Sequence, residues 1–322
     1  MINYEEQRSQ DISQTDVFNS LQVLLPELRE NQIKFLYHGT YNVFEVNDKY
    51  IFRFPDKLFR NLKGVQLIDQ EVKILNFIQK YIYLKIPKPI FISREINNLF
   101  FGYEKIKGIS LSKCFNKTSR SNKIRIAKEV GTFLSQLHSD NLVKKALSKK
   151  IFEEILTPDN YKQEWQNYFD QIQTSTFSLM HLYQKNWVSK LFNFFLKEEK
   201  NFNFTPAIIH GDFDTSNILV DPKTFKITGI IDFENSKIYD PATDFIFYEE
   251  GDIFLKTLLA SYKGHKDQNF IKRMKFLYGC TCLHYIKFGV ENDLNDMVKF
   301  GFQKLNHIII KLRQNQNKFS NI

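Results

Sequence analysis

The sequence predicts an α+β fold in which a sheet comes first and helices dominate afterwards. Several short runs of β-type residues occupy the first third of the chain, around one long segment with a helical apolar stripe. The remainder is mainly helical in its spacing of apolar residues. Two short apolar runs near residues 207 and 230 interrupt the helices, and each ends on polar side chains. We therefore expect an N-terminal antiparallel sheet with one helix, followed by a larger helical part that contains a β-hairpin.

The first third of the chain reads as a helix, three strands, a second helix and two more strands. Residues 16–28 carry apolar side chains at helical spacing, and Pro26 is expected to end or bend that helix. Asn47-Asp48-Lys49 is typical of a turn between two antiparallel strands. The predicted ranges are 16–28 (helix), 34–37, 42–46 and 50–54 (strands), 61–81 (helix), and 90–93 and 99–106 (strands).

The later part of the chain combines amphipathic helices with three short strands. The strongest helical pattern spans residues 121–138, and we expect His138 at its end to pack or cap. Aromatic residues crowd the segment 160–204, and few basic residues interleave with them, so we expect core packing there. The predicted helices are 121–138, 161–168, 187–196, 253–261, 269–288 and 294–312, and the predicted strands are 207–209, 218–220 and 228–231.

Charge is unevenly distributed along the chain. The formal net charge is +9, but the basic residues are scattered and form no block. Residues 210–252 instead contain ten acidic residues against three lysines. Such a region suits a cationic small molecule and repels nucleic acid, so we expect no nucleic-acid partner.

Composition and length describe a globular protein. Hydrophobic residues make up 43% of the 322 residues, which is enough for a sizeable core. The three cysteines form no disulfide framework, the N-terminus is too polar for a secretory signal, and no apolar run reaches 18 residues. We expect a cytoplasmic monomer without a membrane partner.

The segment 207–252 carries the chemistry. Its first apolar run is followed by His210-Gly211-Asp212 and then Asn217, and its second run is followed by Asp232. A hairpin between the runs would bring Asp212, Asn217 and Asp232 into one acidic site. Phosphoryl transfer needs this combination, in which one carboxylate receives the hydroxyl proton while an Asn and a second carboxylate hold Mg²⁺. His210 is expected to support the loop.

This pattern resembles that of the aminoglycoside phosphotransferase family, which is related to protein kinases and choline kinases. The matching stretches are H-G-D-x-x-x-x-N, I-I-D-F fifteen residues later, and the D-P-A-T-D-F run of residues 240–245. The resemblance implies a two-lobed protein-kinase-like fold, with a nucleotide-binding lobe at 1–106 and a catalytic, acceptor-binding lobe at 107–322. It also implies Mg²⁺-dependent transfer of the γ-phosphate of ATP or GTP to an aminoglycoside hydroxyl, an antibiotic-resistance activity.

The resemblance also assigns the nucleotide-binding residues. Arg53 would hold phosphate oxygens and Glu71 would orient it, although the family commonly has Lys at this position and the two cations are not interchangeable. Gly39 and Thr40 lie in the turn expected to cover the phosphates. Glu104 to Ile106 match the hinge, whose backbone holds the purine. The alternative for Arg53 is a strand residue that only pairs with Glu71.

Within the family, the resemblance is closest to enzymes that modify the 2″-hydroxyl of aminoglycosides. Asp212 would bind the acceptor hydroxyl, and Glu234, Glu249 and Glu250 are the acidic residues expected near its ammonium groups. For the last two, the alternative is a favourable charge at the start of the following helix. The sequence departs from that group at Gly211, where Asn is frequent, and at Glu234, where Gly is common.

Three other functions remain open. The first is a kinase of another small molecule, of the choline, macrolide or thioribose type. A nucleotide-binding module without catalysis is supported only by Arg53 and Glu234, and a nucleic-acid binder only by the net charge.

Overall fold

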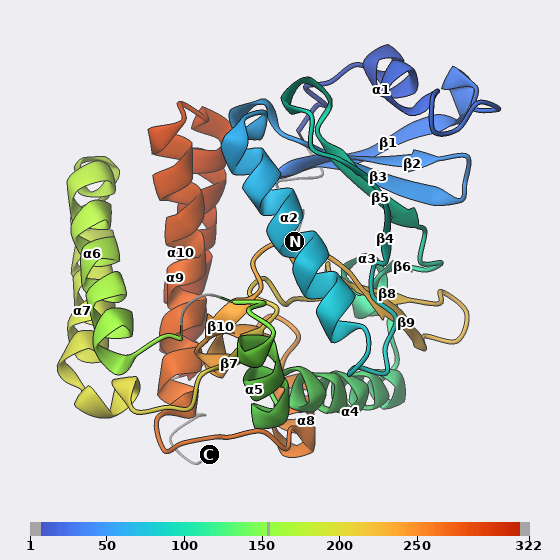
Figure 1. Cartoon of the computed structure of the whole chain (residues 1–322). Coiled ribbons are helices and arrows are strands. Elements are labelled where there is room, and N and C mark those ends of the chain that lie inside the picture. The colour runs from blue at the N-terminus through green and yellow to red at the C-terminus, as the bar shows by residue number, and fades with distance from the viewer. Residues whose placement is uncertain (1–7, 153–154, 316–322) are drawn as a thin grey trace. The chain divides into compact units, whose positions relative to one another are not determined.

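The computed structural model describes residues 8–152 and 155–315, which form two compact units (Figure 1). The first unit combines residues 8–152 with Ile208–Lys237 and Glu249–Gly264, and the second combines residues 155–207, Ile238–Tyr248 and 265–315. The N-terminal sheet and the segment with Asp212, Asn217 and Asp232 therefore belong to the same unit. The lobe boundary after residue 106 stays a prediction.

A five-stranded antiparallel sheet forms the beginning of the first unit, as the sequence predicts. Its strands lie in the order β1-β2-β3-β5-β4. Asn47 and Asp48, with φ values of 54° and 50°, make the tight turn between β2 and β3. The strands are β1 (Ile33–His38), β2 (Tyr41–Val46), β3 (Tyr50–Pro55), β4 (Pro89–Ser93) and β5 (Phe100–Glu104).

Both faces of this sheet are covered. Helix α1 (Gln14–Leu21) packs Val17 and Leu21 against Phe44 and Phe52 on one face. Successive side chains of a strand point to opposite faces, so Arg53, next to Phe52, points to the other one. There it meets helix α2 (Leu62–Ile78), which runs beside the sheet (Figure 1). Strands β2 and β3 lack the alternation of a half-exposed strand, because both of their faces are buried.

The predicted first helix is too long. Helix α1 ends at Leu21 instead of residue 28, and the next residues form turns in which Leu24 and Leu25 both donate to the Leu21 carbonyl. Pro26 prevents the helical bonds from continuing, because it lacks an N–H group and its ring clashes with the preceding turn.

A second, three-stranded sheet completes the first unit together with short helices. The hairpin of β8 (Ile218–Val220) and β9 (Ile227–Ile230) forms as predicted, and β6 (Ile109–Ser110) adds a third antiparallel strand. Two of these elements were not predicted. Strand β6 has only two residues, and helix α5 buries only two side chains. The helices are α3 (Leu111–Cys114), α4 (Arg120–Leu137), α5 (Asp140–Ser148) and α8 (Asp252–Ser261).

His138 caps α4, as predicted. Its ring is buried, and Nδ1 lies 3.0 Å from the hydroxyl of Tyr262, which follows α8. This contact belongs to the packing of α4 against α8.

The second unit is helical and has an aromatic core. Trp165, Phe169, Phe192 and Phe276 pack together, and the rings of Phe169 and Phe192 stack with centroids 4.5 Å apart. This confirms that the aromatic segment is core. Each of its helices extends past the predicted range at one end or both. They are α6 (Pro158–Thr176), α7 (Leu182–Lys197), α9 (Phe270–Glu291) and α10 (Asn295–Asn315).

The remaining elements are short. The chain passes between the units within the strands β7 (Ala207–Ile209) and β10 (Lys237–Tyr239), the second of which was not predicted. Across the described residues, no helix is long and apolar enough to span a bilayer. The 3₁₀ helices are η2 (Glu30–Gln32), η3 (Lys57–Phe59), η4 (Ile96–Asn98), η5 (Phe115–Lys117), η6 (Phe177–Leu179), η7 (Glu199–Phe202) and η8 (Pro241–Phe245).

Candidate active site

Arg53 joins three separate parts of the first unit. From β3, its Nη1 donates to Oε1 of Glu71 on α2 at 2.9 Å. Its Nη2 donates to Oδ1 of Asp232 at 2.8 Å and to Oε2 of Glu234 at 2.9 Å. The side chain is only 3% exposed, and its guanidinium lies 4.2 Å from the centre of the Tyr41 ring. The cation and the acid that the sequence analysis paired are thus in contact, together with the predicted metal-binding Asp232.

Three carboxylates surround this single guanidinium, which leaves the cluster with surplus negative charge. Burial raises the pKa of Glu71 to about 7, against the opposing effect of Arg53, and Asp232 adds to the rise. Burial and the repulsion from Asp232 raise the pKa of Glu234 well above its usual range. Removing carboxylates from water and crowding them disfavours their charged forms. A bound cation would relieve the same repulsion.

Asp232 adopts an unusual backbone conformation directly after β9. Its φ of 73° lies in the left-handed region, which is costly for a residue with a side chain. The bond from Arg53 holds the carboxylate in this orientation. Strain of this kind collects at functional sites, where the surrounding contacts outweigh it.

The loop after β7 is built around His210. This ring is fully buried, and its Nε2 lies 2.9 Å from the Ile231 carbonyl, which can only accept a hydrogen bond. Nδ1 then accepts from the backbone N–H of Asp212 at 3.4 Å. Ser236 Oγ donates to the His210 carbonyl. His210 therefore braces the loop, while Asp212 itself lies on the surface.

Gly211 is required by the close approach of another segment. Its φ is 89°, and a Cβ at this position would lie 2.3 Å from the Asn235 carbonyl oxygen. A side chain fits neither the conformation nor the space. The departure from the His-Asn-Asp sequence of the resembling group therefore has a local structural reason.

Asn217 links the two loops of the predicted acidic site. Its side-chain Nδ2 donates to the backbone carbonyl of Asp212 at 2.8 Å, and its backbone carbonyl accepts from Ile231 N at 3.0 Å. This orientation turns the amide oxygen away from the Asp212 carbonyl. An amide oxygen and the Asp232 carboxylate are ligands of the kind that Mg²⁺ binds.

The turn between β1 and β2 is held in place and touches the same cluster. The Gly39 carbonyl accepts from Arg8 Nη1 at 3.2 Å, and the Thr40 carbonyl accepts from Asp56 N at 2.8 Å. Tyr41, the next residue, places the centre of its ring 4.2 Å from the Arg53 guanidinium. The predicted phosphate-covering turn and the Arg53 cluster are thereby connected.

The predicted hinge follows β5. Glu104 is exposed at the end of the strand, and Lys105 N donates to the Lys49 carbonyl at 2.8 Å. Ile106 packs so closely on Gly229 of β9 that a Cβ there would lie 2.8 Å from Ile106 Cγ2. The predicted hinge residues and the β8–β9 hairpin are therefore neighbours.

Glu249 and Glu250 differ in their surroundings. Glu249 is exposed, whereas Oε1 of Glu250 accepts from Thr215 Oγ1 at 3.0 Å. Burial, with repulsion from Asp214, raises the pKa of Glu250 to about 7. Glu250 thus contacts the loop between Asp212 and Asn217, and Glu249 is the more accessible acid.

Two groups of charged residues were not predicted from the sequence. One lies in the first unit, where His38, Asp11 and Asp56 meet. In the second unit, buried Arg273 donates from Nε to Asp240 at 2.8 Å and from Nη2 to Asp267 at 2.7 Å. Neither group can be recognised in the sequence, because the residues that meet lie far apart in the chain or belong to unrelated sequence patterns.

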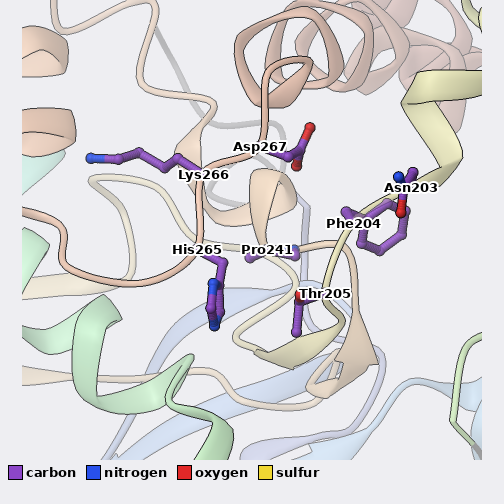
Figure 2. A pocket seen from close by; sticks show the side chains of 7 residues that line it. All are labelled: Asn203, Phe204, Thr205, Pro241, His265, Lys266 and Asp267. Atoms are coloured by element: carbon purple, nitrogen blue, oxygen red, sulfur yellow. The ribbon is translucent and has the colours of Figure 1, made fainter.

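The second unit has a cavity of about 220 Å³ beside Asp267 (Figure 2). The Asp267 carboxylate already accepts from Arg273, and the Lys266 side chain extends away from Asp267 (Figure 2). The cavity is smaller than most ligand pockets, which span about 300–1,000 Å³. None of the predicted site residues lines it. It is lined by Asn203, Phe204, Thr205, Pro241, His265, Lys266 and Asp267.

Comparisons with known proteins agree with this geometry. The model of the phosphotransferase enzyme family matches residues 32–265, well over half of the chain. The GDP complex of aminoglycoside 2'-phosphotransferase-IIIa superposes with a TM-score of 0.81 at 20% identity, covering 94% of this chain and 100% of that one. Macrolide 2'-phosphotransferase MphH from Brachybacterium faecium has a TM-score of 0.69 at 14% identity, covering 90% and 97% of the two chains. These matches confirm the two-lobed kinase-like fold.

Proposed function

The chain belongs to the phosphotransferase enzyme family, and we propose that it transfers the γ-phosphate of ATP or GTP to a hydroxyl of an aminoglycoside antibiotic. One observation carries the proposal: buried Arg53 contacts Glu71, Asp232 and Glu234. In this proposal Arg53 is the cation for the phosphates, and Asp232 beside it is a carboxylate of the kind that Mg²⁺ binds. Positioning and charge neutralisation supply most of the rate in this chemistry.

Asp212 is the proposed catalytic residue. It is exposed and follows a loop fixed by buried His210 and by Asn217. Its carboxylate would accept the proton of the acceptor hydroxyl while that oxygen attacks the γ-phosphorus. The bond to the departing nucleoside diphosphate then breaks.

The residues present fit a Mg²⁺ ion. Asn217 and Asp232 supply neutral and anionic oxygen atoms, and the carboxylate surplus around Arg53 favours a cation. When bound, the ion would offset charge on the phosphates. Arg53 would hold phosphate oxygens beneath the Gly39-Thr40 turn, and the backbone from Glu104 to Ile106 would hold the purine.

The acceptor is proposed to be cationic. Residues 210–252 contain ten acidic residues against three lysines, and Glu249 is exposed next to Glu250. Aminoglycosides carry several ammonium groups, which these acids would receive, and Glu234 is a further acid of the cluster. We also propose that the protein is a cytoplasmic monomer that confers resistance.

Mass spectrometry of reaction products tests the proposal. The protein is incubated with an aminoglycoside panel and with ATP or GTP separately, with Mg²⁺ or with excess chelator. We expect an 80 Da increase of one aminoglycoside, only with Mg²⁺, as calculated for one phosphoryl group. No product with any acceptor and either nucleotide would refute the proposed activity.

A variant of Asp212 tests the mechanism. Asp212→Asn should lower kcat by about 10²–10⁴-fold, because the proton acceptor is lost. Its Kd for nucleotide should match that of the wild type, and Asp214→Asn in the same loop is the control. Turnover near the wild-type rate would exclude Asp212 as the base.

A second candidate is a kinase of another small molecule. Two observations support this candidate. The fold is similar to that of a macrolide 2'-phosphotransferase, and Glu234 stands where the resembling group commonly has Gly. The same assay therefore includes a macrolide, choline and a thioribose sugar. Phosphorylation of one of these alone would replace the aminoglycoside as the substrate.

A further inference from the structure

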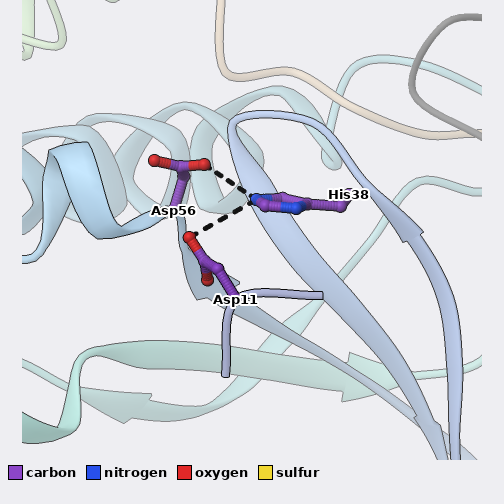
Figure 3. A group of neighbouring side chains, drawn as sticks. All are labelled: Asp11, His38 and Asp56. Atoms are coloured by element: carbon purple, nitrogen blue, oxygen red, sulfur yellow. Dashed lines mark hydrogen bonds and ion pairs between the residues drawn. The ribbon is translucent and has the colours of Figure 1, made fainter. Parts of the chain in front are cut away.

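The N-terminal segment is fastened to the β1–β2 turn by a cluster of charged side chains. We call residues 8–13 the strap. In Figure 3, dashed lines from Asp11 and Asp56 converge on one ring nitrogen of His38. His38 and Asp56 are each 2% exposed, while Asp11 is 14% exposed at the edge of the cluster. None of these residues belongs to the proposed catalytic machinery.

Both ring nitrogens of His38 face acceptors. Nδ1 lies 2.6 Å from the Ser9 carbonyl oxygen, and Nε2 lies 2.8 Å from Asp56 Oδ2. A carbonyl oxygen can only accept, and so can an ionised carboxylate. An imidazolium, which donates from both nitrogens, satisfies both contacts, whereas a neutral ring satisfies one of them.

The other charges around the ring are already paired. Arg8 Nη2 donates to Asp56 Oδ2 at 2.9 Å, and Arg60 pairs with Asp11. The remaining carboxylate contact of the ring is Asp11 Oδ2, 3.6 Å from Nε2. Because each carboxylate has a guanidinium partner, the three residues form a proton-dependent ion-pair cluster, and a metal ion would have to displace Arg8 or Arg60.

We propose that the strap is a proton-dependent latch on the phosphate-covering turn, closed while His38 is protonated and weakened when the ring loses its proton. A neutral ring would turn a lone pair toward either the Ser9 carbonyl or the Asp56 carboxylate, and both contacts repel. The turn would lose support, since Arg8 and Asp56 also hold the backbone of Gly39 and Thr40.

The latch reaches the active site through Tyr41, which follows Thr40. The centre of its ring lies 4.2 Å from the Arg53 guanidinium. Resting on the proposed function, the inference is that nucleotide affinity falls as pH rises and the ring gives up its proton. On the acid side the latch persists, because the pKa of Asp56 is about 2.

The experiment measures the ring, the strap and the ligand on the full chain. Nitrogen NMR reports whether both His38 ring nitrogens carry hydrogen at pH 6. Hydrogen exchange of residues 8–13, corrected for the intrinsic effect of pH, reports strap closure, and titration gives the Kd of ATP and GTP. In the wild type, we expect loss of strap protection and an increase in Kd of about tenfold between pH 6 and 9, the worth of a charge-assisted hydrogen bond.

Three variants separate the latch from general damage. His38→Gln should bind nucleotide weakly at every pH, without the slope. Arg8→Gln should weaken binding but keep the slope, because it removes a clamp that does not titrate. His307→Gln, at an exposed histidine of α10, should behave like the wild type.

The outcomes that overturn the inference are distinct. A neutral His38 ring at pH 6, or a wild-type slope that survives in His38→Gln, would refute the latch. Strap opening with constant Kd would refute its coupling to the turn. If no nucleotide bound at any pH, the proposed function would fail with that coupling, while exchange of the strap would still decide the latch itself.

Discussion

Arg53 takes its place in the site from contacts that its sequence neighbours do not reveal. Between Phe52 and Phe54 it reads as a charge in a buried strand, and its pairing with Glu71 could be anticipated. Its bonds to Asp232 and Glu234 join residues 179 and 181 positions apart. No local pattern encodes such separations. We propose that Arg53 holds phosphate oxygens. Its contacts depend on the forked shape of the guanidinium, so a lysine at this position tests the proposal.

Arg53→Lys should weaken nucleotide binding by about tenfold or more, because an ammonium cannot reproduce the three contacts of the guanidinium. Titration of ATP and GTP measures this. Arg273→Lys is a matched control, since Arg273 is also buried and bound by two carboxylates, in the second unit. Equal losses of affinity in the two variants would mean that Arg53 acts only through stability.

Gly211 offers a comparison between two glycines of similar conformation. Gly211 and Gly251 have φ values of 89° and 86°, but a Cβ meets the Asn235 carbonyl only at Gly211, whereas Gly251 has nothing within 4 Å. Gly251→Ala should cost about 1–3 kcal/mol for the backbone conformation alone, since its φ of 86° and ψ of 167° are reached readily only by glycine. Gly211→Ala should cost more and also lower kcat, because the loop before Asp212 must shift.

Denaturant unfolding and steady-state kinetics check this pair. Equal losses of stability would show that the loop absorbs the added methyl group. In that case the close approach of Asn235 would not explain why Gly occupies position 211.

At the scale of elements, the sheet is stabilised from both sides by helices that meet it differently. Helix α1 contributes apolar packing through Val17 and Leu21. Helix α2 contributes apolar packing too, but also Glu71, which carries the charged contact with Arg53. Side-chain periodicity is sufficient to place these elements, whereas β6 has only two residues and gives no pattern. Helix α1 ends earlier than predicted, because its last residue, Leu21, leads directly into the turns at Leu24 and Leu25.

Leu21→Ala should lower the free energy of unfolding by about 2–5 kcal/mol, since Leu21 is fully buried in this cluster. Val23→Ala, at a residue that is 87% exposed, should change it by less than about 0.5 kcal/mol. Denaturant unfolding measures both. Because α1 holds none of the proposed site residues, kcat per folded molecule should be unchanged, and a large fall in kcat would connect α1 directly to the site.

At the scale of the whole molecule, charge is segregated. A chain of net charge +9 concentrates carboxylates around Arg53 and along residues 210–252. The total charge alone would favour nucleic acid, but the distribution opposes it. Acid stability is a second global property, and it depends on ion pairs such as those of Asp56.

Stability should fall in acid as Asp56 is protonated. Its pKa is about 2 when folded, below the ordinary value of 3.8, so its ionised form stabilises the protein above about pH 4 and this contribution is lost toward pH 2. Asp56→Asn should lower the free energy of unfolding at pH 7 by about 1–2 kcal/mol, allowing for solvent screening. The difference from the wild type should vanish near pH 2.

Unfolding by denaturant between pH 2 and 7 measures this dependence. Asp296→Asn is the control, because Asp296 is 85% exposed in its pair with Lys299 and should contribute little at any pH. A deficit of Asp56→Asn that persisted at pH 2 would assign it to lost packing instead of lost charge.

The sequence by itself determined the α+β class, the five strands of the first sheet, the β8–β9 hairpin and the spacing of Asp212, Asn217 and Asp232. These are local properties, set by side-chain alternation, helical periodicity and turn residues within short windows. Only the tertiary structure decided which carboxylates share Arg53, that His38 fastens the strap, and that the sheet and the catalytic hairpin form one unit. Those contacts join residues distant in the chain, and their energies depend on burial and geometry that no short window contains.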